Sequence, residues 1–345
     1  MKKHKIAVIG ATGNVGREIL TQLNERGFSP ENIYPLASHS SSGKSVSFGL
    51  QTLKIESADT FDFKKVDIVF FSVCGSLSKH YYKKVYDAGC IIIDNSSAYR
   101  MEEGVPLVVA DVNMEDVKDY KNKRIIANSN CVTSPLVMAL KPLEEYGIKR
   151  VVASTYQSVS GAGKKAMDEL YHRTKAFYEV SLSGREVTDK TGEEVFTKDI
   201  AFNCIPHIDV FMEDGRTKEE WKMEVETRKI LKNPNIKICA TCVRVPVFVG
   251  HSISASIEFE KPFDFEELEE KLAEKQGIVM MDRRQNGGYI TPRETVRTTG
   301  VYISRVRRDE SVPNGIALWI SADNIYGIGA AYNAIRIMEE LITIM

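Results

Sequence analysis

The N-terminal segment from Lys5 to Gly16 constrains the fold more than any other part of this 345-residue chain. It reads as a short apolar strand, a glycine-rich turn and the start of a helix, KIAVIGATGNVG. Gly10 permits a tight turn, Gly13 lets the backbone approach a pyrophosphate, and Gly16 lets the helix pack closely on the strand. The spacing is GxxGxxG rather than GxGxxG. This order of elements predicts a dinucleotide-binding α/β domain.

The first third of the chain alternates short apolar runs with helical patterns, which is typical of a doubly wound, Rossmann-type parallel sheet. Two helices are predicted there, at Val15–Asn24 and Ser78–Asp87. The predicted strands are Ile6–Ile9, Ile33–Ala37, Ile68–Ser72, Cys90–Ile93 and Ile125–Ala127.

From Arg150 the pattern changes to longer β-branched runs, such as Val151–Tyr156 and the alternating Ser252–Phe259. This predicts a second domain with a mixed or antiparallel sheet that packs on one face. Further helices are predicted, together with a polar surface excursion over Val180–Lys198. The predicted helices are Lys218–Leu231, Phe265–Lys275 and Gly329–Ile344, the last returning to complete the first domain.

Composition excludes several function classes. The net charge is −1 and basic residues are spread along the chain, which argues against a nucleic-acid or membrane-surface partner. No apolar run is long enough to span a bilayer, and the basic N-terminus leads straight into a strand rather than a signal peptide. We therefore expect a cytoplasmic protein.

The six cysteines do not suggest a disulfide framework in a chain of this length without an export signal. Cys239 and Cys242 have CxxC spacing but lack a second pair or a nearby histidine to complete a zinc set. We interpret them as buried strand residues and predict no metal site.

The end of the second predicted strand indicates which cofactor binds. An NAD site usually carries an acidic residue there, but no acid occurs between Glu31 and Glu56. The hydroxyls of Ser38, Ser40 and Ser41, with a nearby lysine, suit a 2′-phosphate instead. NADP is therefore favoured over NAD, with a plain serine-rich loop as the alternative.

Cys131 is the candidate nucleophile. It lies where the apolar strand around Ile125 turns into a helix that begins near Thr133. Unpaired N–H groups at a helix start favour thiolate over thiol, and the same groups can hold an oxyanion. A thiolate beside a nicotinamide suggests attack on an aldehyde or acyl carbon followed by hydride exchange.

This chemistry also needs a general acid or base. His251 follows an apolar strand at a break, in Gly250-His251-Ser252, where a turn would present it at a cleft. His207 is the runner-up. For either residue alone, a structural role is favoured over a catalytic one.

Several motifs in the same order together resemble the aspartate-β-semialdehyde dehydrogenase family over nearly the whole chain. The motifs are Gly10 to Gly16, Asn95 to Arg100, Asn130-Cys131, Gln157 to Gly163, Glu219 to Lys222, Arg244 to Val247, Gly250 to Ser252 and Ala322 to Asn324. The resemblance implies NADPH-dependent reductive dephosphorylation of β-aspartyl phosphate to aspartate semialdehyde, a step toward lysine, threonine and methionine.

The resemblance also implies the domain organisation. Residues 1–130 would form the NADP-binding domain, completed by the C-terminal helix within 323–345. Residues 131–322 would form a glyceraldehyde-phosphate-dehydrogenase-like α+β domain for catalysis and dimerisation. A homodimer or homotetramer is expected.

The resemblance assigns the catalytic roles. Cys131 would displace phosphate to form an acyl-thioester, His251 would act as general acid/base, and Gln157 would orient the substrate. Cofactor contacts would involve a further set of residues, namely Thr12, Gly13, Asn14, Val15, the Ser38–Ser41 stretch, Ser160, Gly161 and Asn324.

The resemblance assigns substrate contacts too. Arg244 would hold the α-carboxylate, with Glu219 near the α-amino group, while Arg100, Lys222 and Asn130 would bind phosphate. Arginine suits a carboxylate because its fork binds both oxygens. Glu219 and Lys222 are three apart on a predicted helix and so share one face. Without the resemblance, a solvated surface ion pair would be the preferred interpretation.

The chain departs from the family pattern at a few positions. Ser129 stands where proline is frequent, His39 where arginine is common, and Ile325-Tyr326 where Leu-Arg is frequent. None of these changes removes a reacting group.

Two other functions are weighed against this one. N-acetyl-γ-glutamyl-phosphate reductase uses the same cysteine and histidine chemistry, but an N-acetylated substrate offers no ammonium for Glu219. A catalytically silent NADP sensor would share the fold. Such a sensor would not need Cys131, Gln157, Arg244 or His251, all of which are present.

Overall fold

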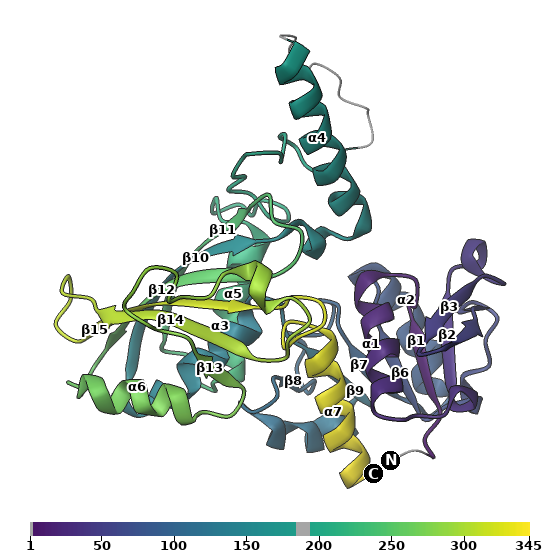
Figure 1. Cartoon of the computed structure of the whole chain (residues 1–345). Helices are drawn as coiled ribbons and strands as arrows, with labels where there is room; N and C mark the ends of the chain where they lie inside the picture. The colour runs from purple at the N-terminus through teal and green to yellow at the C-terminus, as the bar shows by residue number, and fades with distance from the viewer. Residues whose placement is uncertain (1–2, 184–193) are drawn as a thin grey trace. The chain divides into compact units, whose positions relative to one another are not determined.

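The chain forms two compact units in a computed structural model that describes residues 3–183 and 194–345 (Figure 1). The first unit comprises Met1–Lys141, Val225–Pro234 and Ile325–Met345, and the second comprises Pro142–Glu224 and Asn235–Asn324. The expected boundary at residue 130 lies inside the first unit, because the chain after Cys131 continues directly into a helix that ends at Leu140. The assignment of cofactor binding and catalysis to separate domains stays a prediction.

The first unit is built on a seven-stranded parallel sheet in the order β5-β2-β1-β6-β7-β9-β8. Its strands are β1 (Ile6–Ile9), β2 (Ile33–Ala37), β5 (Glu56–Ser57), β6 (Ile68–Phe71), β7 (Ile91–Asp94), β8 (Leu107–Val108) and β9 (Ile125–Asn128). All five predicted strands are confirmed. The strands β1, β6 and β9 are buried throughout, as expected for a parallel sheet covered on both faces.

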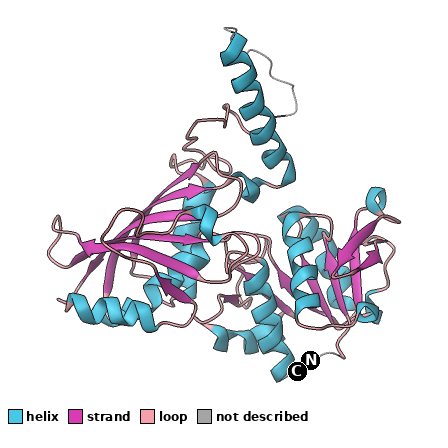
Figure 2. Ribbon diagram, in the orientation of Figure 1, coloured by secondary structure: helices cyan, strands magenta, loops and turns pink. Residues whose placement is uncertain are grey.

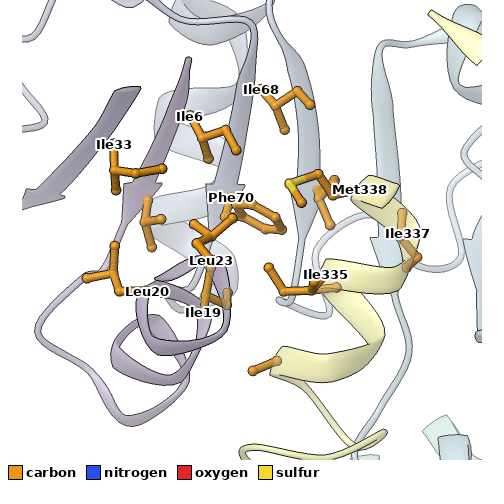
Figure 3. Packing of buried hydrophobic residues seen from close by; sticks show 14 of the residues in the cluster. Ile6, Ile19, Leu20, Leu23, Ile33, Ile68, Phe70, Ile335, Ile337 and Met338 are labelled. Carbon is orange, nitrogen blue, oxygen red and sulfur yellow. The ribbon is translucent and has the colours of Figure 1, made fainter. Parts of the chain in front are cut away.

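Helices complete the first unit. They are α1 (Asn14–Glu25), α2 (Gly75–Asp87), α3 (Thr133–Leu140) and α7 (Ala331–Ile344), with short 3₁₀ turns at Pro30–Asn32, His39–Ser41, Phe63–Lys65 and Met114–Asn122. A hairpin of β3 (Ser45–Phe48) and β4 (Gln51–Lys54) was not predicted. Figure 3 shows Ile19 and Leu23 of α1 in one core with Ile335 and Met338 of α7. The C-terminal helix therefore returns to the first unit, as predicted.

The glycine-rich turn adopts the predicted geometry. Gly10 has a φ of +87°, and a Cβ there would lie 2.2 Å from the carbonyl oxygen of Ser72. A Cβ on Gly16 would lie 2.2 Å from the carbonyl oxygen of Gly10. Only glycine fits at either position, so the close packing of helix on strand predicted from the sequence is confirmed.

The second unit contains a mixed six-stranded sheet in the order β11-β10-β12-β15-β14-β13 (Figure 2). Its strands are β10 (Ile148–Gln157), β11 (Lys237–Arg244), β12 (His251–Phe259), β13 (Ile278–Met280), β14 (Val301–Arg308) and β15 (Gly315–Ala322). Buried and partly exposed residues alternate along β12 from Ile253 onward. The predictions of a mixed sheet and of one packed face are both confirmed.

The remaining helices are α4 (Lys164–Ser183), α5 (Lys218–Ile230) and α6 (Phe265–Glu274), with 3₁₀ turns at Lys141–Tyr146, Val159–Ala162 and Pro292–Thr295. The two predicted helices at 218–231 and 265–275 are confirmed. The predicted excursion over 180–198 begins within the last turn of α4, and its residues 184–193 lie outside the described part of the chain.

The interpretation of the CxxC pair as buried is half wrong. Cys242 is buried, but Cys239 is exposed. Both lie on β11, the first strand of the sheet, and side chains of a strand alternate between its faces. An odd separation therefore puts the two thiols on opposite faces.

Among the helices of residues 3–183 and 194–345, none combines the length and apolar character that a bilayer crossing requires.

Candidate active site

Cys131 lies in the turn between β9 and α3, as predicted. The polar groups of Asn130 fold this turn. Its Oδ1 accepts the N–H of Val132 at 2.9 Å, and its carbonyl oxygen accepts the N–H of Ser134 at 3.0 Å. The thiol of Cys131 is partly exposed. It therefore combines access with a position at a helix start, where N–H dipoles stabilise an anion.

The residues before the turn are tied into the core of the first unit. The side-chain oxygen of Asn128 accepts a hydrogen bond from Asn333 of α7 at 2.6 Å. Ser129 forms a hydroxyl contact with Ser134 of α3. That contact links the two ends of the turn at the position where proline is frequent in the resembled family, so side-chain bonding constrains the turn in place of a fixed φ.

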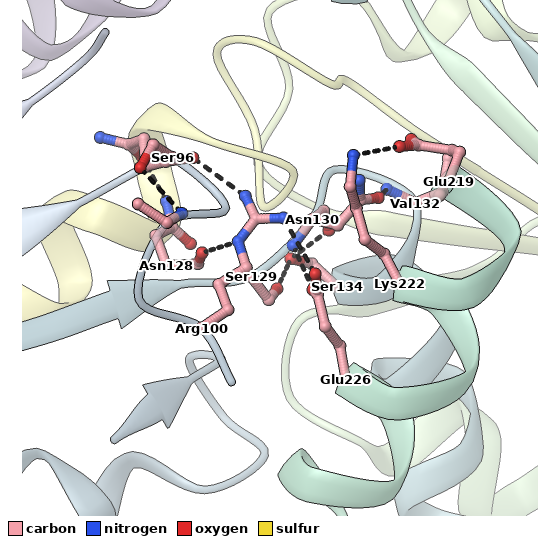
Figure 4. Close-up of polar contacts among 12 residues, drawn as sticks. Ser96, Arg100, Asn128, Ser129, Asn130, Val132, Ser134, Glu219, Lys222 and Glu226 are labelled. Carbon is pink, nitrogen blue, oxygen red and sulfur yellow. Dashed lines mark hydrogen bonds and ion pairs between the residues drawn. The ribbon is translucent and has the colours of Figure 1, made fainter. Parts of the chain in front are cut away.

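Arg100 is buried and held by three segments of the first unit (Figure 4). Its Nε donates to the carbonyl oxygen of Asn128 at 2.8 Å, and its Nη2 donates to the carbonyl oxygen of Asn95 at 2.9 Å. Its Nη1 donates to Oε1 of Glu226 at 3.0 Å. The guanidinium is thus fixed in orientation, unlike that of a solvated surface arginine.

Glu226 joins two of the predicted phosphate-binding residues. Its second oxygen, Oε2, accepts the backbone N–H of Asn130 at 2.8 Å, while Oε1 binds Arg100. Its side chain is only 1% exposed. The structure therefore brings Arg100 and Asn130 together at the carboxylate of Glu226. The sequence analysis did not identify Glu226.

The spacing of charged residues along α5 could have identified Glu226 from the sequence. Glu219, Lys222, Glu226 and Lys229 follow one another at i, i+3, i+7 and i+10, which places them on one face of the helix. Only the first two were singled out from the sequence. Lys229 Nζ donates to three backbone carbonyls in the segment 100–105, and burial lowers the pKa of this lysine. Glu219, Lys222 and Glu226 are buried, so this charged face is not a solvated one in the structure.

Asp94 anchors the start of the segment that carries Arg100. Its carboxylate accepts the hydroxyl of Ser78 on α2 and both the N–H and hydroxyl of Ser96, each at 2.9 Å. Burial raises the pKa of Asp94 to about 6, against the opposing effect of these hydrogen bonds. The loop after β7 is therefore pinned to the sheet and to a helix.

The predicted cofactor residues of the first unit lie at one edge of its sheet. Thr12 and Gly13 are exposed in the turn after β1, and Asn14 and Val15 begin α1. Within the described residues, no side chain caps the start of α1. An exposed turn at a helix start, beside glycines that admit no side chain, fits a pyrophosphate.

The Ser38–Ser41 stretch lies at the same edge, because β1 and β2 are parallel neighbours with Ile9 opposite Leu36. The hydroxyls of Ser38 and Ser40 are 3.0 Å apart, and Ser38, His39, Ser40 and Lys44 are exposed. This strand end presents hydroxyls and bases rather than a carboxylate, a chemistry that fits a 2′-phosphate.

In the second unit, strand ends gather the other predicted residues. Gln157 and Arg244 are paired at the ends of the parallel strands β10 and β11. His251 begins β12, which runs antiparallel to β10, and it is paired with the last residue of β15. Asn324 lies shortly after the end of that strand. Three stretches far apart in sequence, around residues 157, 244–251 and 324, thus meet at one end of the sheet.

His251 is fully buried and has a defined tautomer. Its Nδ1 lies 3.0 Å from the backbone nitrogen of Ser158. An N–H group can only donate, so Nδ1 must accept and the neutral ring carries its proton on Nε2. Burial and the charge of Arg244 lower the pKa of His251 to about 3. Among the described residues Nε2 has no hydrogen-bond partner.

Gly161 leaves room beside these groups. A Cβ on Gly161 would lie 3.1 Å from Nη1 of Arg244 and 3.4 Å from Nε2 of His251. Asn324 Oδ1 accepts the N–H of Gly250 at 2.9 Å, and Asn324 Nδ2 donates to the hydroxyl of Ser160 at 3.0 Å. The predicted residues Ser160, Gly161 and Asn324 therefore adjoin the buried histidine.

A chain of hydrogen bonds joins Gln157 to α5. Gln157 Nε2 donates to Glu219 at 3.1 Å, and Lys222 Nζ donates to Glu219 at 2.9 Å and to Asp209 at 2.6 Å. Burial alone would lower the pKa of Lys222, but the two carboxylates more than offset it and raise that pKa. Glu219 and Lys222 are buried, so the solvated surface pair is excluded.

The runner-up histidine has a different environment. His207 stacks on Phe211 with ring centroids 4.3 Å apart, and Phe211 is exposed. Within residues 3–183 and 194–345, no three potential ligands of the His, Cys, Asp and Glu types gather as a metal site would require.

Comparison with known proteins gives the family. Residues 5–120 match the family model described as semialdehyde dehydrogenase, NAD binding domain, and residues 140–326 match its dimerisation domain. The aspartate-semialdehyde dehydrogenase of Rickettsia bellii is 49% identical over 99% of this chain and 98% of that protein.

Two crystal structures extend this likeness. The Vibrio cholerae aspartate semialdehyde dehydrogenase II complexed with ASA is 40% identical, covers 99% of each chain and has a TM-score of 0.92. The Candida albicans enzyme with NADP is 27% identical, covers 98% of each chain and has a TM-score of 0.73. This chain therefore belongs to the aspartate-semialdehyde dehydrogenase family.

Proposed function

We propose that this chain catalyses the NADPH-dependent reductive dephosphorylation of β-aspartyl phosphate to L-aspartate 4-semialdehyde and phosphate, a step toward lysine, threonine and methionine. The observation that carries the proposal is full-length identity of up to 49% to proteins named for this activity. The alternatives, an N-acetyl-γ-glutamyl-phosphate reductase and a silent sensor, have no comparable support.

In this proposal Cys131 forms the covalent intermediate. The thiolate Sγ bonds to the acyl carbon of the substrate, and the phosphate leaves with the electron pair of the broken C–O bond. Arg100 and Asn130 bind the phosphate. In this proposal the positive end of the α3 helix dipole stabilises the thiolate and the oxyanion of the tetrahedral adduct.

His251 acts through Nε2. Because its Nδ1 accepts the N–H of Ser158, Nε2 holds the proton of the neutral ring. We place this proton toward the substrate oxygen, where negative charge develops, because a buried donor without an internal partner is suited to an oxyanion. The strongly lowered pKa of His251 keeps the ring neutral at physiological pH in the enzyme before substrate binds.

Recognition of the aspartyl part is assigned to the second unit. Arg244 has the planar fork that matches an α-carboxylate, and one of its nitrogens is already fixed at 2.7 Å from the carbonyl oxygen of Ser158. Glu219 offers a carboxylate to the α-ammonium. Gln157, held by Glu219, orients the substrate, and Lys222 adds positive charge for the phosphate.

NADP is the proposed cofactor. The glycine-rich turn would hold the pyrophosphate, and Ser38, Ser40 and Ser41 would contact the 2′-phosphate. Ser160, Gly161 and Asn324 would lie along the nicotinamide part. When bound, the cofactor supplies the hydride. The crystal structure of the Candida albicans relative is a structure with NADP, which supports this choice.

The dimerisation-domain match supports an oligomer, and we propose a homodimer or a dimer of dimers. Sedimentation equilibrium would distinguish the two. The cytoplasmic location remains a prediction, which cell fractionation would check.

A steady-state assay in the reverse direction tests the proposal. Wild-type enzyme, aspartate semialdehyde and phosphate are combined with NADP or NAD, and NADPH or NADH is followed by absorbance. We expect phosphate-dependent turnover, faster with NADP. Turnover only with N-acetylglutamate semialdehyde would establish the first alternative, and cofactor binding without turnover of either aldehyde would establish the sensor.

A further inference from the structure

We propose that Glu226 is a positioning residue of the phosphate subsite, which holds the guanidinium of Arg100 and the backbone amide of Asn130 in one fixed geometry. The inference rests on the proposed function, in which these two residues bind phosphate. Neither the sequence motifs nor the family resemblance assigns a role to Glu226.

The first step is the match between donors and acceptors. Glu226 faces two N–H donors, from Arg100 at 3.0 Å and from Asn130 at 2.8 Å. A carboxylate supplies two acceptor oxygens, so one residue satisfies both. An isosteric amide offers one acceptor and one donor, and its NH₂ group would oppose one of these N–H groups. The site therefore requires a carboxylate rather than any polar side chain of this size.

The second step is burial. Glu226 is 1% exposed and Arg100 is 8% exposed by side chain. A buried ion pair is costly to desolvate and is weak evidence for net stability, so we assign the value of this pair to fixing geometry. Water competes poorly for hydrogen bonds at such a site, which makes the orientation of the guanidinium depend on its protein partners.

The third step is the donor count of Arg100. A guanidinium has five N–H groups, and the contacts with Asn128, Asn95 and Glu226 use one on each nitrogen. A second N–H belongs to each terminal nitrogen. Two neighbouring donors suit two oxygens of one phosphate. Glu226 selects which of these donors face the substrate, and through the Asn130 amide it also fixes the residue next to Cys131.

The direction in which the KM for phosphate changes distinguishes a positioning role of Glu226 from an effect of its charge. Removing a negative charge beside Arg100 would by itself tighten phosphate binding. Losing the donor match would weaken it, because two bonds involving charged groups are disturbed. We expect Glu226→Gln to raise the KM for phosphate about 10-fold or more, by the usual effect of disturbing such a bond. The KM values for the aldehyde and NADP stay within about twofold of wild type.

Glu226→Asp and Glu224→Gln complete the experiment. Aspartate keeps the charge and both oxygens but is one methylene shorter, so it also raises the KM for phosphate. Glu224 lies on the same helix and pairs with Arg216 instead, so its variant keeps wild-type kinetics. If Glu226→Gln does not fold, as judged by thermal unfolding and NADP binding, Glu226→Asp decides the question.

The outcomes are distinguishable. A raised phosphate KM in both Glu226 variants supports the proposal. A lowered phosphate KM in Glu226→Gln with an unchanged one in Glu226→Asp would show an effect of charge alone and overturn it. Unchanged phosphate kinetics, or an equal loss for all three reactants, would overturn it as well. Absence of phosphate-dependent turnover in wild-type enzyme would instead defeat the proposed function.

Discussion

The surroundings of Cys131 and of His251 are built by different means. Around Cys131 much of the site is backbone: a strand-to-helix turn and the carbonyl oxygens of Asn95 and Asn128 that hold Arg100. Around His251 the site is mainly side chains from distant segments that position one another. Gln157 binds Glu219, and Ser158, Ser160 and Asn324 bind together beside the histidine.

This difference decides which changes each region tolerates. A backbone-built site survives truncation of a reactive side chain, because the turn keeps its hydrogen bonds. A site of mutually positioned side chains transmits a change at one member to its neighbours, and the effects do not add. We therefore expect a single substitution in the first unit to remove one function and leave the others intact. A single substitution in the second unit should also affect the neighbouring side chains.

The largest effect tests the first half of this comparison. Cys131→Ala removes the nucleophile, so phosphate-dependent NADPH formation should fall by about 10⁴-fold or more. NADP should still bind, because the glycine-rich turn lies elsewhere in the unit and is unchanged. Turnover and NADP binding by fluorescence titration are the measurements. Cys204→Ala, at an exposed thiol, is the control and keeps activity. Normal turnover in the Cys131 variant would defeat the assigned chemistry.

Much of the first unit was predictable because its signals are local. The buried apolar runs of β1, β6 and β9 are recognisable from three or four residues each, and Gly10 marks a position that excludes any side chain. The two-residue strands β5 and β8 carry no such pattern. Cys131 was placed correctly because a strand-to-helix turn is a local event.

The contacts of the second site were less predictable because they are not local. Ser158 and His251 are 93 residues apart in sequence, and the hydrogen bond between them depends on β10 and β12 being neighbours in the sheet. Asp209 as a partner of Lys222 had no sequence signal at all. Glu226 is intermediate, since the helical spacing after Lys222 points to it although the motif ends before it.

The next effect in size tests the histidine. His251→Asn removes the Nε2 donor from the position proposed for the oxyanion, so kcat should fall about 10²- to 10³-fold with a smaller change in KM. Steady-state kinetics with varied aldehyde separate the two constants. His207→Asn is the matched control, since that ring stacks on Phe211 and should leave kcat unchanged. A change confined to KM in the His251 variant would indicate a binding role instead.

The burial of His251 also predicts a pH dependence of stability. Its pKa is lowered from the ordinary 6.5 to about 3. Between pH 3 and pH 6.5 the imidazole is therefore protonated in the unfolded chain but neutral in the folded chain. Stability is therefore complete above pH 6.5 and falls as the pH drops toward 3. At pH 5 this residue should cost about 2 kcal/mol relative to neutral pH.

Urea unfolding of wild type and His251→Asn at pH 5 and pH 7.5 measures this contribution. The difference in unfolding free energy between the two pH values should be smaller in the variant by about that amount. An identical pH dependence in both proteins would show that His251 is not held neutral by burial.

The smallest effect sharpens the contrast between the regions, because it adds a single methyl group. In Gly161→Ala the new Cβ would lie 3.1 Å from Nη1 of Arg244, closer than an ordinary contact, so the guanidinium must shift by a few tenths of an ångström. The KM for the aldehyde should rise about threefold, with stability almost unchanged, because a weak loss of fit at a charged contact is worth less than one full hydrogen bond.

Gly163→Ala is the control for Gly161→Ala, because it should change stability and leave KM unchanged. Gly163 has a φ of +93°, and among the described residues no neighbouring heavy atom lies within 4 Å of the place that a Cβ would take. A methyl group there strains the backbone without touching Arg244. It should lower the free energy of unfolding by about 1 kcal/mol and leave KM alone. Kinetics and urea unfolding of both variants form the test. If the two alanines shifted KM equally, mutual positioning of side chains would not govern this region, and the comparison with the backbone-built turn at Cys131 would lose its basis.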